Sequence, residues 1–368
     1  GPDGALYIAD MYREVIEHPK SLHPVIKKHL DLTSGRDRGR IYRLVPNAFQ
    51  QPRVPQMSQF STEQLVAALQ SPNAWHRETA TRLLYQRQDR AAVRPLEALA
   101  RHAKHPQGRI AALNALIGLS ALTPDIPWPA LEDDHPMVRR AAVRISERVA
   151  HTSPALRDKL CTMIDDDSPH VRYQLAFSLG EFSGPQRDEA LAKLLLKNPQ
   201  DASIRLAVGT SLTEGSGAVL AQLIAPDDFV GSREGLRTIE AIAAQIGRQQ
   251  QPNDVAAVVK SLAILAEVRD KSVTDAILTG LNAAEGSPLR KQIDAASGGR
   301  ASEQIQQLVT TARARALNED APVKERVAAI SQLRLGDAKE LMETFDALLA
   351  PDQPIAIQSA AIDALATF

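Results

Sequence analysis

Apolar residues recur with helical periodicity through most of the chain, in short segments separated by turns that contain proline. The first clear segment begins at residues 60–65 (FSTEQL), where Ser61 can cap a helix and Gln64 completes a capping box. Ser71-Pro72 ends that helix and begins another, because proline is tolerated in the first turn of a helix. The pattern therefore predicts two short helices joined by a tight turn.

The same two-helix pattern returns about every 32 residues. An arginine follows each turn, and the intervals between successive arginines are first 32, 30, 33, 33 and 32 residues. The spacing is less regular between residues 237 and 326, where residues 287–290 (SPLR) have the form of one more unit. In the last unit Gln358 takes the place of the arginine. The repeated arginines are Arg77, Arg109, Arg139, Arg172, Arg205, Arg237 and Arg326.

One helix pair cannot bury its own apolar face, so successive pairs must stack and share a continuous core. We therefore expect residues 60–368 to form a mainly α fold, an α-solenoid of about nine helix pairs. The composition agrees with this expectation, because aromatic residues make up only 4% of the chain and an all-β body is usually richer in them.

The repeated arginines allow two interpretations. In the first, each guanidinium reaches turn carbonyls or an aspartate of an adjacent unit, and the row forms a structural ladder that sets the stacking angle. Asp134, Asp167 and Asp201 precede these positions and favour the ladder. In the second interpretation, the row of arginines binds an anionic partner.

Val138-Arg139 and Val171-Arg172, each shortly after a proline-containing turn, resemble the units of HEAT repeats. The resemblance implies a HEAT-like, or armadillo-like, α-solenoid. It also implies a surface for binding other proteins or neighbouring domains, without naming a partner.

The first 45 residues follow a different pattern. Residues 5–10 (ALYIAD) and 41–45 (IYRLV) alternate as strands do, and a polar insertion from Glu14 to Leu32 lies between them. Two strands alone are marginally stable in water. We therefore expect these strands to pair with something outside the chain, which would make the chain a C-terminal piece of a longer protein.

Two longer motifs carry a family resemblance. Residues 1–8 (GPDGALYI) and 39–44 (GRIYRL) are similar to strand motifs of propellers of the glucose/sorbosone dehydrogenase type. Residues 9–19 (ADMYREVIEHP), followed by 37–43 (DRGRIYR), resemble the planctomycete-type membrane-bound dehydrogenase-domain proteins. That family joins a propeller to HEAT repeats and often ends in a c-type cytochrome module.

This resemblance implies three parts. Residues 1–45 would be incomplete propeller-blade strands with a polar insertion, residues 46–59 a linker, and residues 60–368 the solenoid. It also implies haem c or a quinone in the larger protein, and a periplasmic or other extracytoplasmic location. Because Cys161 is the only cysteine, no Cys-x-x-Cys-His motif is present and haem attachment is not carried over. We expect no cofactor and no metal in this segment.

The candidates for chemistry lie near the first strand. Asp10 and Arg13 would contact substrate or quinone if the strand end faces a propeller channel, and His18 would act as a base or metal ligand if Glu17 or Asp10 supports it. In the alternative interpretation Asp10 caps the following turn, Arg13 pairs with it, and His18 lies in a turn.

Arg38 and Arg40 form a second candidate, an anion-binding pair. In the alternative interpretation, Asp37 and solvent satisfy both guanidinium groups.

The charge balance and hydropathy narrow the function classes. The formal net charge is −1 and no long basic run occurs, which disfavours nucleic acid as a partner. No uninterrupted apolar run approaches the roughly 18 residues of a membrane span.

Three functions stay open. The first is a scaffold segment of a larger dehydrogenase or electron-transfer protein, itself non-catalytic. The second is a free-standing adaptor that binds proteins, which would make residues 1–45 dispensable for folding. The third is an enzyme with a site on the concave face of the solenoid, which the scarcity of aromatic residues disfavours.

Overall fold

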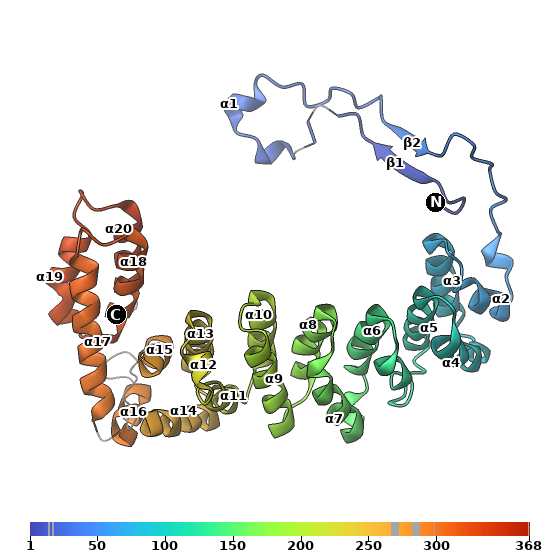
Figure 1. Cartoon of the computed structure of the whole chain (residues 1–368). Coiled ribbons are helices and arrows are strands. Elements are labelled where there is room, and N and C mark those ends of the chain that lie inside the picture. Colours follow the sequence, from blue (N-terminus) through green and yellow to red (C-terminus); the bar gives the residue numbers. More distant parts are fainter. Residues whose placement is uncertain (14, 17, 266–271, 282–287, 298, 367) are drawn as a thin grey trace. The chain divides into compact units, whose positions relative to one another are not determined.

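The computed structural model describes residues 1–13, 15, 16, 18–265, 272–281, 288–297, 299–366 and 368. Glu14, Glu17 and Ser287 of the sequence motifs lie outside the described residues. The chain forms two compact units, Gly1–Ala130 and Leu131–Phe368. Helices dominate both units, and the strands among the described residues make one two-stranded sheet. The predicted mainly α, HEAT-like solenoid is confirmed (Figure 1).

The two predicted strands are β1 (Leu6–Asp10) and β2 (Arg40–Leu44). They pair with each other as an antiparallel hairpin, in a register that sets Leu6 opposite Leu44 and Asp10 opposite Arg40. The insertion between them carries the short helices η1 (Pro19–Ser21) and α1 (Pro24–Lys27). The long insertion lets the chain fold back on itself, and the expected pairing with further strands outside the chain stays a prediction.

Four helices follow the hairpin in the first unit: α2 (Thr62–Ala68), α3 (Ala74–Arg87), α4 (Val93–His102) and α5 (Pro106–Gly118). The predicted capping box is present, since Gln64 N–H donates to Ser61 Oγ at 3.2 Å and Ser61 N–H donates to Gln64 Oε1 at 2.8 Å. α2 packs against α3 and α4 against α5, and α3 packs against α5. Leu65, Leu69 and Leu96 are fully buried between them.

The start of the chain is attached to the first helix pair. Asn73 Nδ2 donates to the carbonyls of Gly1 at 3.1 Å and Pro2 at 3.3 Å. His76 Nε2 lies 2.8 Å from the Pro2 carbonyl oxygen. The predicted boundary at residues 46–59 falls inside the first unit, and these hydrogen bonds hold the turn before β1 against the start of α3.

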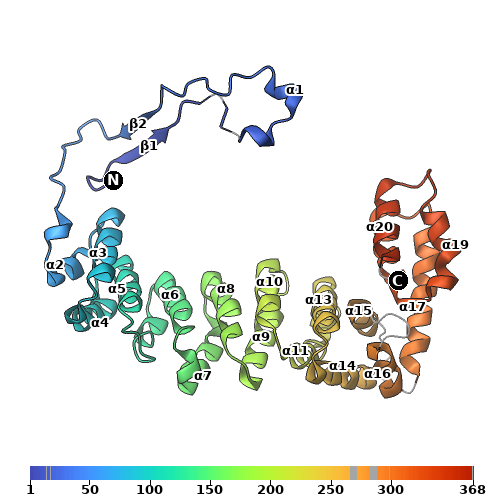
Figure 2. The same ribbon diagram turned by 180° about the vertical axis from the view of Figure 1, so that it is seen from behind.

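The second unit is built from two layers of helices. One layer contains α7 (Pro154–Thr162), α9 (Pro185–Lys197), α11 (Ser216–Leu223), α14 (Pro252–Leu265) and α16 (Pro288–Ser297), each packed on the next. The other contains α6 (Pro136–Ser146), α8 (Pro169–Ser178), α10 (Ala202–Ser211), α13 (Arg233–Gln249) and α15 (Ser272–Leu281), packed in the same way. The short helix α12 (Asp227–Val230) precedes α13. Figure 2 shows this alternation from the opposite side.

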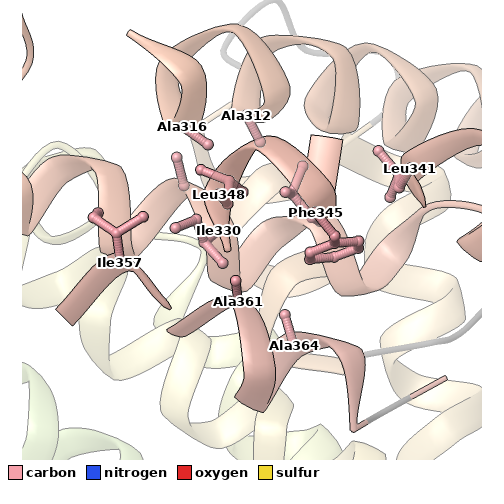
Figure 3. Close-up of a cluster of buried hydrophobic side chains, with 11 residues drawn as sticks. Ala312, Ala316, Ile330, Leu341, Phe345, Leu348, Ile357, Ala361 and Ala364 are labelled. Atoms are coloured by element: carbon pink, nitrogen blue, oxygen red, sulfur yellow. The ribbon is translucent and has the colours of Figure 1, made fainter. Parts of the chain in front are cut away.

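The last part of the second unit is a helical cluster of its own. It contains α17 (Arg300–Leu317), α18 (Val323–Gln332), α19 (Ala338–Leu348) and α20 (Ile355–Leu365). Phe345, 1% exposed, projects into the shared core, as Figure 3 shows. Alanines from α17 and α20, Ala312, Ala316 and Ala361, lie in the same core. Small side chains on two helices leave room for the ring.

Phe345→Ala should lower the free energy of unfolding of the chain by about 3–5 kcal/mol, because it removes a buried ring and leaves a cavity. Met342, on the same helix and 50% exposed, offers the control: Met342→Ala should change stability by less than about 0.5 kcal/mol. Urea unfolding followed by circular dichroism measures both variants. Equal effects of the two substitutions would contradict the core position of Phe345.

Candidate functional site

The repeated arginines lie at equivalent positions in successive helix pairs. Most occupy the fourth position of the second helix of a pair, while Arg237 is one position later in α13 and Gln358 is fourth in α20. The fourth-position arginines are Arg77 in α3, Arg109 in α5, Arg139 in α6, Arg172 in α8, Arg205 in α10 and Arg326 in α18.

Five of these six arginines fold back onto the segment that precedes their own helix, while Arg326 donates through Nε to the Ala316 carbonyl near the end of α17 at 2.9 Å. Arg139 Nη1 donates to the Asp133 carbonyl at 2.8 Å, and Arg172 Nη1 donates to the Asp166 carbonyl at 2.7 Å. Arg77, Arg109 and Arg205 make the same hydrogen bond to the carbonyls of Ser71, Ala103 and Pro199. Because the turn carbonyls have no helical partner, the guanidinium supplies one.

In the second unit three of these side chains also reach the turn of the following helix pair, and Arg205 instead meets Thr238 Oγ1 within α13 at 3.5 Å. Arg139 holds both carboxylate oxygens of Asp166, with Nε to Oδ2 at 2.7 Å and Nη2 to Oδ1 at 2.8 Å. Arg172 Nε donates to Asn198 Oδ1 at 3.2 Å. Arg326 Nη2 donates to Gln353 Oε1 at 2.6 Å. These contacts make a ladder along one edge of the unit, and they commit the guanidinium groups to the protein's own acceptors.

Asp166 is the most tightly held acceptor of the ladder. Its side chain is 7% exposed. Burial by itself would raise the pKa of Asp166, but the hydrogen bonds from Arg139 and from the Ser168 N–H outweigh burial, and the pKa is lowered. The carboxylate is therefore ionised at neutral pH and pairs with Arg139 as a bidentate ion pair.

Sequence reasoning missed one member of this arrangement. Arg157, in the first helix α7, donates through Nη1 to the carbonyls of Ala150 at 3.1 Å and His151 at 3.2 Å. The signal was present, because Ser153-Pro154 precedes Arg157 with the spacing seen in the second helices. The same local hydrogen-bonding pattern thus occurs in both layers.

The two ends of the insertion between β1 and β2 line an open cavity of about 630 Å³. Tyr12, Arg13, Gly35 and Arg38 are among its lining residues. Arg13 Nη2 donates to the Leu32 carbonyl at 2.7 Å, which ties the two ends of the insertion. Gly35 has a positive φ of +77°, and a Cβ there would lie 1.8 Å from the Tyr12 carbonyl oxygen. This close approach requires glycine.

The structure brings Arg13 and Arg38 to this cavity, and its lining does not include Asp10 or His18. Asp10 Oδ1 accepts a hydrogen bond from the Tyr12 N–H at 2.9 Å. His18 Nδ1 accepts one from the Lys20 N–H at 3.2 Å and caps a short turn. Both contacts stabilise local turns. The described hydrogen bonds include none between Asp10 and His18, so the structure does not pair them as acid and base.

Arg40 lies beside the cavity rather than in its lining. Its guanidinium is stacked 4.8 Å from the centre of the Tyr12 ring and donates to the Tyr42 hydroxyl at 3.3 Å. Cation–π contacts of this kind stabilise an exposed arginine without a carboxylate partner.

Sequence reasoning also missed the role of Asp3, which it treated only as part of a turn. Its Oδ2 accepts from the Tyr7 hydroxyl at 2.8 Å and from Arg43 Nη2 at 2.7 Å, and its Oδ1 accepts from the Ala5 N–H at 3.1 Å. Burial would raise the pKa of Asp3, but the hydrogen bonds from Tyr7 and Ala5 and the charge of Arg43 lower it to about 2. Asp3 therefore joins β1 to β2 as a carboxylate.

An exposed surface lies on the second-helix layer of the second unit, next to the ladder. It consists of the fifth and ninth residues of three neighbouring helices, and we call it the second-helix face. Tyr173 and Phe177 of α8 are 37% and 38% exposed and meet edge to face with their ring centres 5.1 Å apart. Leu206 of α10 is 72% exposed. The face comprises Arg140, Arg144, Tyr173, Phe177, Leu206 and Thr210.

Two observations concern metal ligands and the cysteine in the part of the chain that the structure describes. No group of three or more His, Cys, Asp and Glu side chains there could hold a metal ion. Cys161 is a free, half-buried thiol, and burial, helped by the charge of Asp158, raises its pKa to about 11. At neutral pH it is a poor nucleophile.

A membrane span is a separate question. None of the described helices combines the length and apolar character that crossing a bilayer requires.

Comparison with known proteins supports the fold. Residues 128–213 match HEAT repeats, and residues 1–48 match a domain of unknown function, DUF7133. No curated protein matches the chain.

Among solved structures, the crystal structure of Kap121p has 13% sequence identity and a TM-score of 0.54, covering 83% of this chain and 37% of that chain. A Kap121p mutant with three acidic residues changed to lysine has 12% identity and a TM-score of 0.54, covering 88% and 38%. The chain thus spans well under half the length of Kap121p, and at this identity the likeness concerns the fold alone.

Asp166→Asn should lower the free energy of unfolding by about 2 kcal/mol at pH 7, because it removes a charge-assisted pair of hydrogen bonds. The folded-state pKa of Asp166 is lowered. Its contribution is therefore fully present above the ordinary aspartate pKa of about 4 and is lost as the pH falls through the lower folded-state value. Urea unfolding of wild type and variant between pH 7 and pH 3 measures both effects.

The neighbouring residue Asp167 is exposed, and Asp167→Asn removes a charge from the same turn without touching the bidentate pair. We expect a change below about 0.5 kcal/mol for this control. A difference between wild type and Asp166→Asn that grows as the pH falls below 4 would show that the sign of the pKa shift is wrong.

Cys161 should react with iodoacetamide at pH 8 at least about 100-fold more slowly than glutathione, because a pKa of about 11 leaves little thiolate. Mass spectrometry of quenched samples measures the rate. The urea-unfolded chain is the control and should react at the rate of an ordinary thiol. A fast reaction of the folded chain would refute the buried setting of the sulfur.

Proposed function

We propose that this chain is a non-catalytic HEAT-repeat scaffold within a larger dehydrogenase or electron-transfer protein, and that its second-helix face binds a protein partner or a neighbouring domain. HEAT repeats suggest protein interaction, and the match at residues 128–213 covers the helices that carry this face. The family resemblance of residues 1–45 supports the dehydrogenase parent.

One observation carries the binding role. The chain is poor in aromatic residues, at 4%, yet Tyr173 and Phe177 are side by side on the surface beside the exposed Leu206. Arginines on the adjacent helix α6, Arg140 and Arg144, flank them. Tyrosine and arginine are enriched among the residues that dominate protein–protein binding energy, and contiguous exposed apolar surface marks interaction sites.

The hairpin supports the second part of the proposal. Leu6, Ile8, Ile41 and Leu44 are between 47% and 73% exposed, so the hairpin leaves large apolar side chains uncovered. Each strand has one partner, which leaves two free edges that further strands can extend. A hairpin of this kind fits the edge of a larger sheet, such as a propeller blade in the preceding part of a longer chain.

On this proposal the reactive groups belong to other modules. A propeller would hold a quinone and a cytochrome module would hold haem c, while the repeat array would keep them at a set separation. An extracytoplasmic location follows from the same resemblance. A free-standing adaptor is the competing function, and it differs in having no such modules on either side.

The flanking coding sequence tests the parent directly. Propeller blades upstream and a Cys-x-x-Cys-His motif downstream would support the electron-transfer parent. An upstream stop codon and a downstream sequence without that motif would leave the adaptor as the better account.

The double variant Tyr173→Ser, Phe177→Ser should weaken binding to a flanking module at least tenfold, because aromatic side chains at the centre of an interface contribute about 2 kcal/mol or more. Its thermal unfolding midpoint should fall only modestly and leave the variant folded at the titration temperature, since neither side chain belongs to the buried core. Isothermal titration of the full chain with each separately produced flanking module measures the affinity.

Ile362→Ser is the matched control, because Ile362 is 59% exposed but lies on α20, away from the second-helix face. It should leave the affinity unchanged. An equal loss in the control, or full affinity in the double variant, would contradict the assignment of the face.

A further inference from the structure

The second-helix face has apolar residues in its middle and arginines at its sides. α6, α8, α10 and α13 pack in succession, so residues at the same helix position form rows across them (Figure 1). The fifth-position row of the face contains Arg140, Tyr173 and Leu206, and the next helix adds Arg237. A partner that covers the apolar middle therefore also meets guanidinium groups.

The two arginines of α6 are not engaged by the protein itself. Arg144 is exposed and Arg140 is partly exposed. Neither side chain forms an ion pair or a hydrogen bond with a residue in the described part of the chain. Arg139, one position before them, is bound by the Asp133 carbonyl and by the Asp166 carboxylate. The same helix thus carries one structural arginine and two that can bind a ligand.

The acidic group closest to Arg144 in the sequence is Glu147, and α8 holds it. Its Oε1 accepts from Ser178 Oγ at 2.5 Å and from Gln174 Nε2 at 3.2 Å. Burial is the main cause that raises the pKa of Glu147, and the hydrogen bond from Ser178 opposes it. Because its carboxylate is occupied by α8, Glu147 offsets the charge of the two arginines only in part.

The charge balance differs between the two sides of the face. On the α6 side, the exposed residues Arg148 and Glu181 follow the two helices, so three arginines stand against two glutamates. On the α13 side, Arg237 is close enough to Glu240 for its charge to oppose the burial that raises the pKa of Glu240. The excess positive charge therefore lies over α6, beside the aromatic pair of α8.

The spacing of the helices limits the shape of a matching ligand. Axes of packed helices lie about 8–10 Å apart, so the arginines of α6 are roughly that far from the aromatic pair. An extended peptide advances about 3.3 Å per residue. A segment in which acidic residues stand about three positions from a large apolar residue would therefore reach both groups at once.

We propose that the partner bound at the second-helix face presents an extended acidic segment, whose carboxylates pair with Arg140 and Arg144. A large apolar side chain of the same segment packs on the aromatic pair of α8. Charge-assisted hydrogen bonds between arginine and carboxylate are short and specific in geometry. The inference rests on the proposed function, because it names the chemistry of the partner for the same face.

An acidic peptide fits this face better than a nucleic acid does. Nucleic acids are held mainly by neutralising many phosphates in succession. The chain has a formal net charge of −1, and the free arginines of the face are grouped on one helix beside an apolar surface. A short acidic segment with an apolar residue matches both features.

The test uses the full chain and a dansyl-labelled synthetic peptide in which three glutamates, two serines and a leucine–phenylalanine pair follow one another. Fluorescence anisotropy should show saturable binding that weakens at least about fivefold when the salt concentration rises from about 0.05 M to about 0.3 M, because screening weakens exposed charge pairs. A peptide with lysines in place of the glutamates should bind at least about tenfold more weakly, because like charges then meet.

The double variant Arg140→Gln, Arg144→Gln removes both charges and keeps much of each side chain. It should bind the acidic peptide at least about fivefold more weakly and lose most of the salt dependence. The matched control is Arg315→Gln, Lys324→Gln, which removes two charges from exposed positions on α17 and α18. Its affinity should stay within about twofold of wild type. Circular dichroism checks that both variants fold.

The outcomes separate this inference from the proposed function. Equal binding of the acidic and lysine peptides would overturn the acidic partner, and so would loss of binding in Tyr173→Ser, Phe177→Ser but not in the arginine variant; both results leave the face as a binding surface. Unchanged affinity in both double variants would overturn the assignment of the face itself. Absence of saturable binding of the acidic peptide overturns the inference alone, because titration with the flanking modules tests the proposed function separately.

Two further arms address other occupants. A short oligothymidylate that displaces the acidic peptide at equal concentration would overturn the inference in favour of a nucleic acid. A dimer in sedimentation velocity that Tyr173→Ser, Phe177→Ser abolishes would overturn it in favour of a second copy of the chain. A monomer that keeps the peptide in the presence of the oligonucleotide supports the acidic partner.

Discussion

The structure depends on one constraint: a pair of short helices cannot cover its own apolar face, so each pair must be covered by the next. In the second unit this produces two layers, in which α7, α9, α11 and α14 pack in succession and α6, α8, α10, α13 and α15 do the same. Stacking at a regular spacing brings the turns of successive pairs along one edge. An arginine at the fourth position of a second helix can then reach the following turn, as Arg139 reaches Asp166.

The same geometry distinguishes the helix positions that contact the turns from the helix positions that face solvent. The fourth position faces the turns, and its guanidinium is occupied by carbonyls and by acceptors such as Asp166 and Asn198. For Arg139 and Arg172 this occupation favours the interpretation as a ladder over the interpretation as an anion-binding surface. The fifth and ninth positions face away from the core, so the residue type there can differ from one helix pair to the next without affecting stacking. In α8 these positions hold Tyr173 and Phe177, which a partner can reach.

In the layer of first helices, charged side chains occupy buried positions that are usually apolar. Arg187 is as buried as the core leucines, and Asp254 nearly so. Burial of an ionised side chain is costly unless it is paired. Arg187 is paired with Asp188, whereas one oxygen of Asp254 has no hydrogen-bond partner among the described residues. Asp166 of the ladder differs from Asp254, because both of its oxygens accept from Arg139.

The sequence by itself determined the helices, the capping box at Ser61, the repeat and the positions of the arginines, because caps, prolines and apolar periodicity act over a few residues. It also indicated both strands. Only the tertiary structure decided that β1 pairs with β2, that the first turn is attached to Asn73 and His76, and that Asp3 meets Arg43. The sequence likewise could not predict the hydrogen bond between the Gly217 N–H and Asp254, since these residues are 37 positions apart. Such contacts join distant segments and leave no local pattern, so they follow from how the pairs stack.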